Sequence, residues 1–273
     1  MTRLIDLGLA EDLGEGDCTS IATVPADAQA RGRLLAKQPL VVCGVPLLER
    51  VFARVGGAEV TVHLGEGAEA TAGTVVATVV GAARALLAGE RLALNFVQHT
   101  TGIATLTKTV VAAAAGTSLV VRDTRKTVPG MRRLAKYAVR TGGGANHRMG
   151  LDDAILVKDN HLTLGRGDLA DAVANARQAY PELPLEVEVR TQRELQAALA
   201  AEPDLILLDN MSVEALREAV ALTAGRVPLE ASGGITLESI RDVAATGVEY
   251  VAMGQLTHSA PAADLSLKLE PVA

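Results

Sequence analysis

The chain has 273 residues, a length that suits one large domain or two unequal ones. Hydrophobic residues make up 49% of it and aromatic residues only 2%, so we expect aliphatic α/β packing with few stacking platforms for nucleic-acid bases. The formal net charge of −6 argues against a sequence-independent affinity for nucleic acid, and any basic cluster should therefore form a local pocket.

The N-terminal part of the chain predicts a small domain of mixed structure, residues 1–103. Short strand-like runs occur within 30–44 and 59–81, where glycine and proline turns interrupt them. The segment 46–57 between them reads as a helix that closes on glycine. Helical spacing then continues over 82–116, and we expect this long helix to bridge two domains.

After residue 118 a strand-then-helix unit recurs. The predicted strands are SLVVRD, AILVKD, LPLEVEV, LILLDN, VPLEAS and YVAMGQ. Amphipathic helices separate the last four, and each begins near a Ser or Thr suited to an N-cap, namely Thr191, Ser212 and Thr236. This alternation predicts a parallel sheet with right-handed crossovers, either closed as a barrel or left open.

Polar residues follow each of these strands. In a parallel α/β barrel the carboxyl ends of all strands open onto one face, where the active site is built. The residues concerned are Asp123, Arg125, Lys126, Lys158, Asp159, Asn160, His161, Glu188, Asp209, Asn210, Ser232, Gly233, Gly234, Gly254, Thr257 and His258.

A strongly cationic pocket is expected at this face. Arg125, Lys126, Arg148 and Lys158, with His147, suit a ligand that carries carboxylates or phosphates. The alternative is that these are solvated loop charges, because polar residues are normal in loops.

Two acids stand at neighbouring strand ends. Glu188 lies within LEVEVR, where a strand buried on both faces favours apolar residues, and Asp209 ends LILLD. They could hold Mg²⁺ or accept hydrogen bonds from sugar hydroxyls. Equally, they could only neutralise nearby Lys and Arg side chains.

Glycine-containing turns end the last two strands, in EASGGI and VAMGQLTHS. Backbone N–H groups in such turns can bind a phosphate, although either glycine could also serve only a positive φ angle. The run RTGGGANHRMG matches neither the GxGxxG nor the Walker spacing, so we expect no dinucleotide or P-loop site there.

Neither a disulfide nor a membrane span is predicted. Cys18 and Cys43 stand alone, without a CxxC or metal-ligand spacing. No apolar run reaches transmembrane length, and the first residues lack the apolar core of a signal peptide. We therefore expect a cytoplasmic protein without a membrane partner.

Several motifs together carry a family resemblance across nearly the whole chain. They are EDLGEGDCTS, ERLALNFVQHTTGIAT, DTRKTVPGMRRLAKYAVRTGGGANHRMGLDDAILVKDNH, LEVEV, LILLDN, EASGGI and MGQLTHSAPAADLSL. In this order they resemble the quinolinate phosphoribosyltransferase family. Thr100 and Thr101 depart from the family pattern, in which we expect Leu and Ser.

The resemblance implies an α/β fold: an N-terminal α/β sandwich domain and an incomplete, about seven-stranded α/β barrel over residues 104–263. It also implies that the tail, 264–273, returns to the N-terminal domain as a strand. Family members are homodimers or higher homo-oligomers, in which the N-terminal domain of one subunit covers the barrel mouth of its neighbour.

The implied reaction joins quinolinate to 5-phosphoribosyl 1-diphosphate with Mg²⁺, giving nicotinate mononucleotide, diphosphate and CO₂. The resemblance assigns quinolinate binding to Arg91 (from the neighbouring subunit), Arg125, His147, Arg148 and Lys158. It assigns the phosphoribosyl substrate to Lys126, Glu188, Asp209, Ser232, Gly233, Gly254 and His258. Lys126, Glu188 and Asp209 are the expected catalytic residues, and the two acids are expected to meet Mg²⁺, directly or through water.

Three other functions compete with this one. A molybdenum-associated relative of the same fold is disfavoured because every cation that a dicarboxylate needs is present. A nicotinate phosphoribosyltransferase would need fewer cations, because its substrate carries one carboxylate. A catalytically silent ligand-binding or scaffold subunit is the alternative outside enzymes.

Overall fold

A computed structural model describes residues 2–165 and 167–272. The chain forms two compact units, and the division passes through the long helix α4 (Ala83–Ala113) after Lys108. The first unit holds the preceding chain, together with Arg140–Gly142 and the segment from Ala260 onward, and the second holds the rest. The predicted long helix over 82–116 is thereby confirmed as a helix.

The first unit contains a four-stranded sheet in the order β12-β1-β5-β3 and a small pair, β2-β4. Its other elements, besides the first part of α4, are α1 (Thr2–Leu13), α2 (Cys18–Thr23), β1 (Gln29–Ala36), β2 (Leu40–Val41), α3 (Pro46–Phe52), β3 (Glu59–Val62), β4 (Glu69–Ala70), β5 (Val75–Ala82) and β12 (Leu265–Pro271). The strand runs and the helix expected between residues 30 and 81 are confirmed.

Two features of this unit escaped the sequence patterns. Helix α1 buries Ile5 and Leu9, a short i, i+4 stripe that a twelve-residue helix needs to pack. Strand β12 pairs antiparallel with β1 along its length, with Leu267 opposite Leu34. Since β1 also pairs with β5, it is a central strand, and half of its residues are buried.

Thr100 and Thr101, the departures from the family pattern, have structural roles within this unit. Both side chains are fully buried, and both hydroxyls donate to the Cys43 carbonyl, at 2.8 and 3.0 Å. The Cys43 amide donates in return to the Thr101 hydroxyl, at 3.1 Å. The two threonines therefore satisfy a buried loop backbone, which hydroxyl-bearing residues do well.

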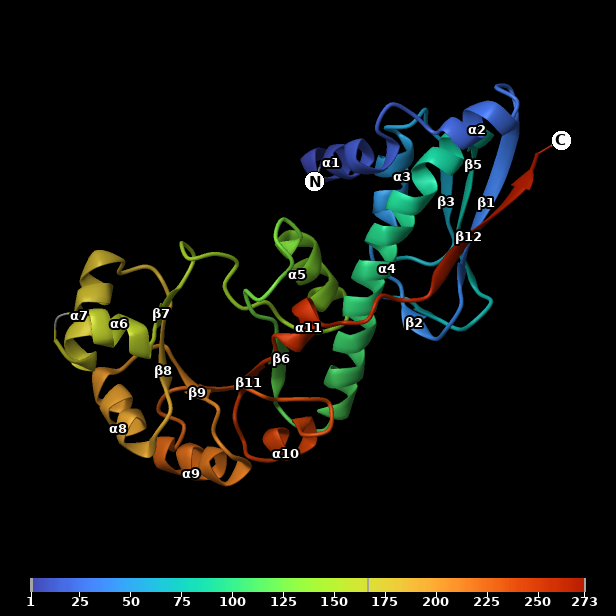
Figure 1. Ribbon diagram of the computed structural model, residues 1–273. Helices are drawn as coiled ribbons and strands as arrows, with labels where there is room; N and C mark the ends of the chain where they lie inside the picture. The colour runs from blue at the N-terminus through green and yellow to red at the C-terminus, as the bar shows by residue number, and fades with distance from the viewer. Residues whose placement is uncertain (1, 166, 273) are drawn as a thin grey trace. The chain divides into compact units, whose positions relative to one another are not determined.

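The second unit contains a six-stranded parallel sheet in the order β6-β11-β10-β9-β8-β7 (Figure 1). Its elements, besides the end of α4, are β6 (Val120–Arg122), α5 (Arg132–Thr141, whose end belongs to the first unit), β7 (Ile155–Val157), α6 (Asp159–Leu164), α7 (Leu169–Ala179), β8 (Leu185–Val189), α8 (Gln192–Ala201), β9 (Leu205–Asp209), α9 (Val213–Thr223), β10 (Leu229–Ser232), α10 (Ile240–Ala244), β11 (Tyr250–Ala252) and α11 (Gln255–His258).

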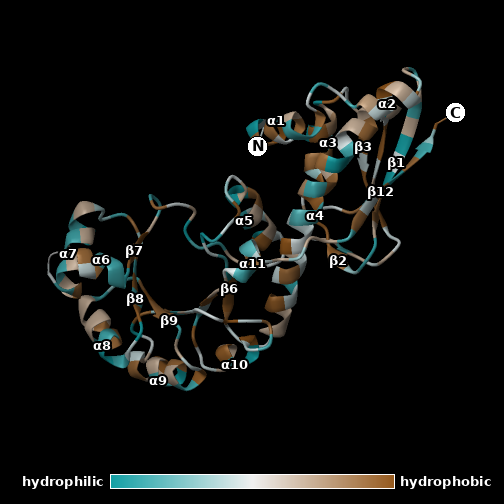
Figure 2. Cartoon of the chain, viewed as in Figure 1, coloured by the Kyte–Doolittle hydropathy of each residue, from teal (hydrophilic) through white to brown (hydrophobic). Residues whose placement is uncertain are grey.

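The six predicted strands are confirmed, and the sheet curves as part of a barrel. Helices α7, α8 and α9 follow one another along the outside of the curve, where they cover the sheet (Figure 1). Figure 2 shows these helices with alternating polar and apolar residues, as helices between a core and solvent should have.

The predicted helix caps are confirmed at two of three positions. The Thr191 hydroxyl accepts from the Glu194 amide, and the Ser212 hydroxyl accepts from the Ala215 amide, both at 3.2 Å. The prediction for Thr236 is wrong, because α10 begins only after Ser239. The Ser239 hydroxyl instead accepts from the Thr236 amide and closes a turn before the helix.

The seventh strand of the expected barrel is represented, among the described residues, by one isolated parallel bridge between Arg122 and Ala145. The Ala145 amide donates to the Val121 carbonyl, and the Asp123 amide donates to the Ala145 carbonyl, at 2.8 and 3.2 Å. The glycines before Ala145 hid this contact from strand patterns. This bridge matters for the site because it brings the residues that follow Ala145 to the carboxyl end of β6.

Candidate active site

The carboxyl ends of all six strands border one pocket of about 180 Å³. Its lining residues are Thr124, Arg125, Lys126, His147, Arg148, Leu156, Lys158, Glu188, Leu207, Asp209, Glu230, Ser232 and Ala252. The parallel sheet therefore gathers most of the predicted site residues, although they come from segments far apart in the sequence.

Arg125 and Arg148 make the pocket strongly positive. Burial and the neighbouring Arg125 guanidinium both lower the pKa of Arg148 below its ordinary value. Arg125 Nε is buried without a hydrogen-bond partner among the described residues, and neither guanidinium takes part in an ion pair there. Two cations that repel each other, one of them with a buried Nε that has no partner among the described residues, favour an anionic ligand.

Glu188 and Asp209 border the same pocket and pair with cations of the protein. Lys158 Nζ forms an ion pair with Glu188. Arg190, which the sequence patterns did not single out, lies 3.2 Å from Asp209 Oδ2, 3.8 Å from Glu188 Oε1 and 2.6 Å from Asp159 Oδ2. Glu188 and Asp209 therefore do neutralise nearby cations, which was the alternative role considered for them. Arg190 contacts both acids and so connects the ends of strands β8 and β9.

A second pocket, of about 380 Å³, lies at the loops after β10 and β11. Ser232, Gly233, Gly254 and His258 line it, as predicted for a phosphate site. Gly233 has φ +92°, and a Cβ there would lie 2.3 Å from the Asn210 side chain, so only glycine fits this turn. Lys126 and Ser232 line both pockets, which are therefore adjacent.

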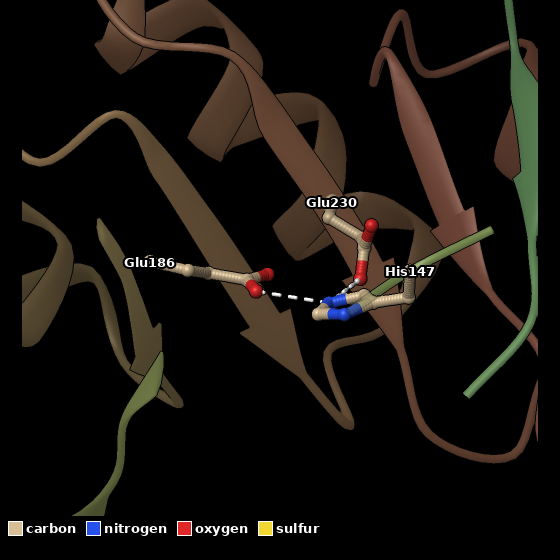
Figure 3. A group of neighbouring side chains, drawn as sticks. All are labelled: His147, Glu186 and Glu230. Atoms are coloured by element: carbon tan, nitrogen blue, oxygen red, sulfur yellow. Dashed lines mark ion pairs between the residues drawn. The ribbon is translucent and has the colours of Figure 1, made fainter. Parts of the chain in front are cut away.

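His147 is held between two buried glutamates that the sequence analysis did not select (Figure 3). Its Nε2 lies 2.9 Å from Glu186 Oε2 and 3.3 Å from Glu230 Oε1, on strands β8 and β10. Its Nδ1 accepts the Arg148 amide at 2.7 Å. Glu186 lies two residues before Glu188 on the same face of β8, and this spacing was the signal available in the sequence.

His147 and Glu186 bind protons more tightly than isolated side chains do. Burial lowers the pKa of His147, but the hydrogen bonds and charges of Glu186 and Glu230 outweigh it and raise that pKa to about 9. Burial and the Glu230 charge raise the pKa of Glu186. Nδ1 can accept the Arg148 amide only in the ring form that carries its single proton on Nε2, the nitrogen that faces the carboxylates.

We predict that the free energy of unfolding falls as the pH rises from 6.5, the ordinary pKa of histidine, to about 9. In this window the folded state binds more protons than the unfolded chain does, so raising the pH favours unfolding, by up to about 3 kcal/mol. Urea unfolding across this range should show the slope, and His147→Gln should flatten it. His63→Gln, at an exposed site, is the control and should leave the slope unchanged; equal slopes for all three proteins would contradict the prediction.

A buried polar network holds the segment that carries His147 and Arg148. Lys136 Nζ forms an ion pair with Asp123 and donates to the His147 carbonyl at 2.9 Å. Asn146 Nδ2 donates to Asp123 and, at 2.9 Å, to the Lys136 carbonyl. The His147 amide donates to Asp123 Oδ1 at 3.1 Å. Strand β6 and helix α5 therefore anchor this segment by charge-assisted hydrogen bonds.

Arg91 is the predicted site residue that lies in the first unit. It is exposed on helix α4 and lines neither pocket described above. Its assignment to a neighbouring subunit's site stays a prediction. In the described parts of the chain, each helix is too short or too polar to span a lipid bilayer.

Comparison with known proteins gives a consistent result. Residues 17–101 match the N-terminal domain of quinolinate phosphoribosyl transferase, and residues 103–268 match its C-terminal domain. The carboxylating nicotinate-nucleotide pyrophosphorylase of Mycobacterium leprae (strain TN) is 48% identical over 269 residues, which are 96% of this chain and 94% of that protein. The decarboxylating quinolinate phosphoribosyltransferase 1b of Nicotiana tabacum is 39% identical over 289 residues, 98% of this chain and 81% of that protein.

Among solved structures, NadC from Streptococcus pyogenes superposes with a TM-score of 0.94 at 39% sequence identity, covering 99% of this chain and 96% of that one. Both domains therefore match in the same order, and the similarity to these proteins covers 96–99% of this chain. The chain belongs to the quinolinate phosphoribosyltransferase family.

Proposed function

We propose that the protein is a carboxylating nicotinate-nucleotide diphosphorylase, a pentosyltransferase of de novo NAD synthesis. It transfers the phosphoribosyl group of 5-phosphoribosyl 1-diphosphate to quinolinate and releases diphosphate and CO₂. The observation that carries this proposal is a pair of guanidinium groups, Arg125 and Arg148, that form no ion pair among the described residues, in a pocket that adjoins a glycine-lined one at Lys126. This arrangement suits a small dicarboxylate beside a phosphorylated sugar.

Quinolinate occupies the cationic pocket. Arg125, Arg148 and Lys158 bind its two carboxylates, and His147 borders the same space. Aromatic residues make up only 2% of the chain, so charge rather than stacking holds the pyridine ring. The phosphoribosyl group lies across both pockets, with Glu188 and Asp209 near its hydroxyls and with Ser232, Gly233, Gly254 and His258 near its 5-phosphate.

Catalysis rests on positioning and electrostatics. The pyridine nitrogen attacks the anomeric carbon while the bond from that carbon to the diphosphate oxygen breaks, and Lys126 stabilises the charge that develops on the leaving group. The carboxylate beside the ring nitrogen then leaves as CO₂. The cationic pyridine ring accepts the electron pair left behind, and a proton from solvent replaces the lost group. No nucleophilic side chain is needed.

The residues present fit a Mg²⁺ ion. Glu188 and Asp209 place two carboxylates at neighbouring strand ends, and both border the pocket that we assign to the diphosphate substrate. Magnesium is usually bound by one or two carboxylates together with substrate phosphates. Bound there, the ion would neutralise diphosphate charge, and Glu188 and Asp209 would hold it directly or through water.

A paired assay tests the function. Purified protein receives 5-phosphoribosyl 1-diphosphate and Mg²⁺ with either quinolinate or nicotinate, while diphosphate, CO₂ and mononucleotide are followed. We expect all three products from quinolinate alone, loss of activity with a chelator, and recovery with excess Mg²⁺. No turnover with either acid would overturn the proposal and favour the molybdenum-associated or scaffold alternative.

We also propose a cytoplasmic homodimer or higher homo-oligomer in which Arg91 of one subunit reaches the pocket of its neighbour. The family resemblance supports this assignment, and so does the exposure of Arg91 on helix α4. A guanidinium group from the neighbouring subunit would complete the set of cations around the dicarboxylate.

Subunit complementation is the sharpest test of this shared site. Arg91→Ala and Lys126→Ala should each be nearly inactive alone. Co-expressed in equal amounts, they should recover about a quarter of the wild-type activity, because half of the dimers are hybrid and one of the two sites in a hybrid is intact. Activity that stays at the level of the single variants, in hybrids isolated with two affinity tags, would contradict the shared site.

A further inference from the structure

Glu186 and Glu230 are two acids in the interior of a barrel that we expect to bind a dianion. Their side chains are 6% and 0% exposed, and strand β9 separates the strands that carry them. Glu186 does not line the cationic pocket; it lines a separate cavity of about 400 Å³ at the opposite, amino-terminal ends of the strands. Both acids would repel a dicarboxylate, so they cannot bind it directly. Their burial inside the barrel therefore needs another explanation.

Both carboxylates converge on one imidazole edge, that of His147 (Figure 3). Since Nε2 faces the two acids and Nδ1 accepts the Arg148 amide, every polar atom of the ring has a partner. His147 lines both cavities and therefore stands between them. The ring cannot rotate without breaking at least one of these contacts.

Arg122 completes the arrangement. Its Nη1 lies 2.9 Å from Glu230 Oε2, and its guanidinium lies 3.5 Å from the centre of the Tyr250 ring. This ion pair with Arg122 neutralises part of the charge of the two carboxylates.

We propose that Glu186 and Glu230 are positioning residues that lock the His147 ring and, through the bond from Nδ1 to the Arg148 amide, place Arg148 for the dicarboxylate. The inference rests on the proposed function for its substrate, and on the side-chain geometry for the lock itself. Its effect should fall mainly on the pyridine dicarboxylate, because His147, Glu186 and Glu230 are not among the described residues that line the glycine-lined pocket.

The first test separates the KM values of the two substrates. Glu186→Ala should raise the KM for quinolinate by at least about tenfold and leave that for 5-phosphoribosyl 1-diphosphate within about twofold, because a misplaced binding group costs this much or more. Glu186→Gln should recover most of the loss, because its amide oxygen can still accept from Nε2. Glu182→Ala, at an exposed position ahead of β8, is the matched control. A loss of stability with both KM values unchanged would overturn the proposal.

The second test needs no turnover and so distinguishes a failure of this inference from a failure of the proposed function. Long-range ¹H–¹⁵N NMR of the histidine rings, recorded above pH 9 where His147 carries one proton, should show that proton on Nε2 and none on Nδ1 in the wild-type protein and in Glu186→Gln. If Glu186→Ala folds too poorly for the KM measurements, Glu230→Gln is compared with the wild-type protein in its place. A His147 ring that exchanges between tautomers in the wild-type protein would overturn the lock. So would a stoichiometric transition metal, detected by elemental analysis and lost in Glu186→Gln, because the three side chains would then be metal ligands.

Discussion

Replacing Lys126 with alanine will lower kcat by about two to three orders of magnitude while quinolinate still binds. Lys126 is, among the described residues that line both pockets, the one that carries a charge. Its side chain is exposed, and its ammonium group forms no ion pair within the described residues. A free cation between the two pockets is placed to meet the diphosphate as it leaves, when negative charge grows on the bridging oxygen.

The measurement pairs steady-state kinetics with calorimetric binding of quinolinate. We expect its Kd to stay within about threefold of the wild-type value, since Arg125, Arg148 and Lys158 are unchanged. Lys37→Ala removes an exposed lysine from the first unit and serves as the control. Unchanged turnover in Lys126→Ala would refute the assignment. Equal losses of turnover and of quinolinate affinity would place Lys126 on the dicarboxylate instead.

Replacing Lys136 with methionine will destabilise the protein by about 3–5 kcal/mol. The Lys136 and Asp123 side chains are 1% and 0% exposed, so the change leaves an unpaired carboxylate in the core. Burial already raises the pKa of Asp123, although hydrogen bonds from Lys136 and Asn146 oppose that effect. The variant also loses the hydrogen bond to the His147 carbonyl.

Urea unfolding measures this loss, and a double variant tests its cause. Adding Asp123→Asn to Lys136→Met removes the buried charge but keeps an acceptor for the His147 amide, so part of the stability should return. Arg133→Met changes the neighbouring cation on the same helix, where the side chain is exposed, and should shift stability by less than about 0.5 kcal/mol. If the single and double variants are equally unstable, the lost charge balance is not the cause.

Much of the site could be predicted because strand ends are visible in the sequence. Arg125, Lys126, Lys158 and Asp209 each follow an apolar run, and a parallel sheet brings such positions to one edge. Glu186 and Glu230 were not predicted although their strands were, because each is the second residue of its strand and lies away from the carboxyl end. Arg190 was missed because an exposed arginine after a strand looks like an ordinary loop charge.

Lys136 shows a different limit. It lies between Ala135 and Tyr137 in a helix that also buries Leu134, Ala138 and Val139, and nothing nearby in the sequence predicts a charge in the core. Its partner, Asp123, precedes it by thirteen residues, and the shared contact, the His147 carbonyl, follows by eleven. Such a group of contacts exists only once β6, α5 and the segment at Ala145 are packed together.

Local patterns along the chain were enough to predict six strands, the helices between them, two of their caps and the charged residues at the strand ends. Only the packed fold shows which charges pair, where the segment from Ala145 to Arg148 enters the barrel, and which side of His147 faces the two glutamates. The physical reason is range. Alternation and helical spacing reflect each residue's neighbours along the chain, whereas an ion pair or a raised pKa depends on burial and on distances between residues that only the packed sheet brings together.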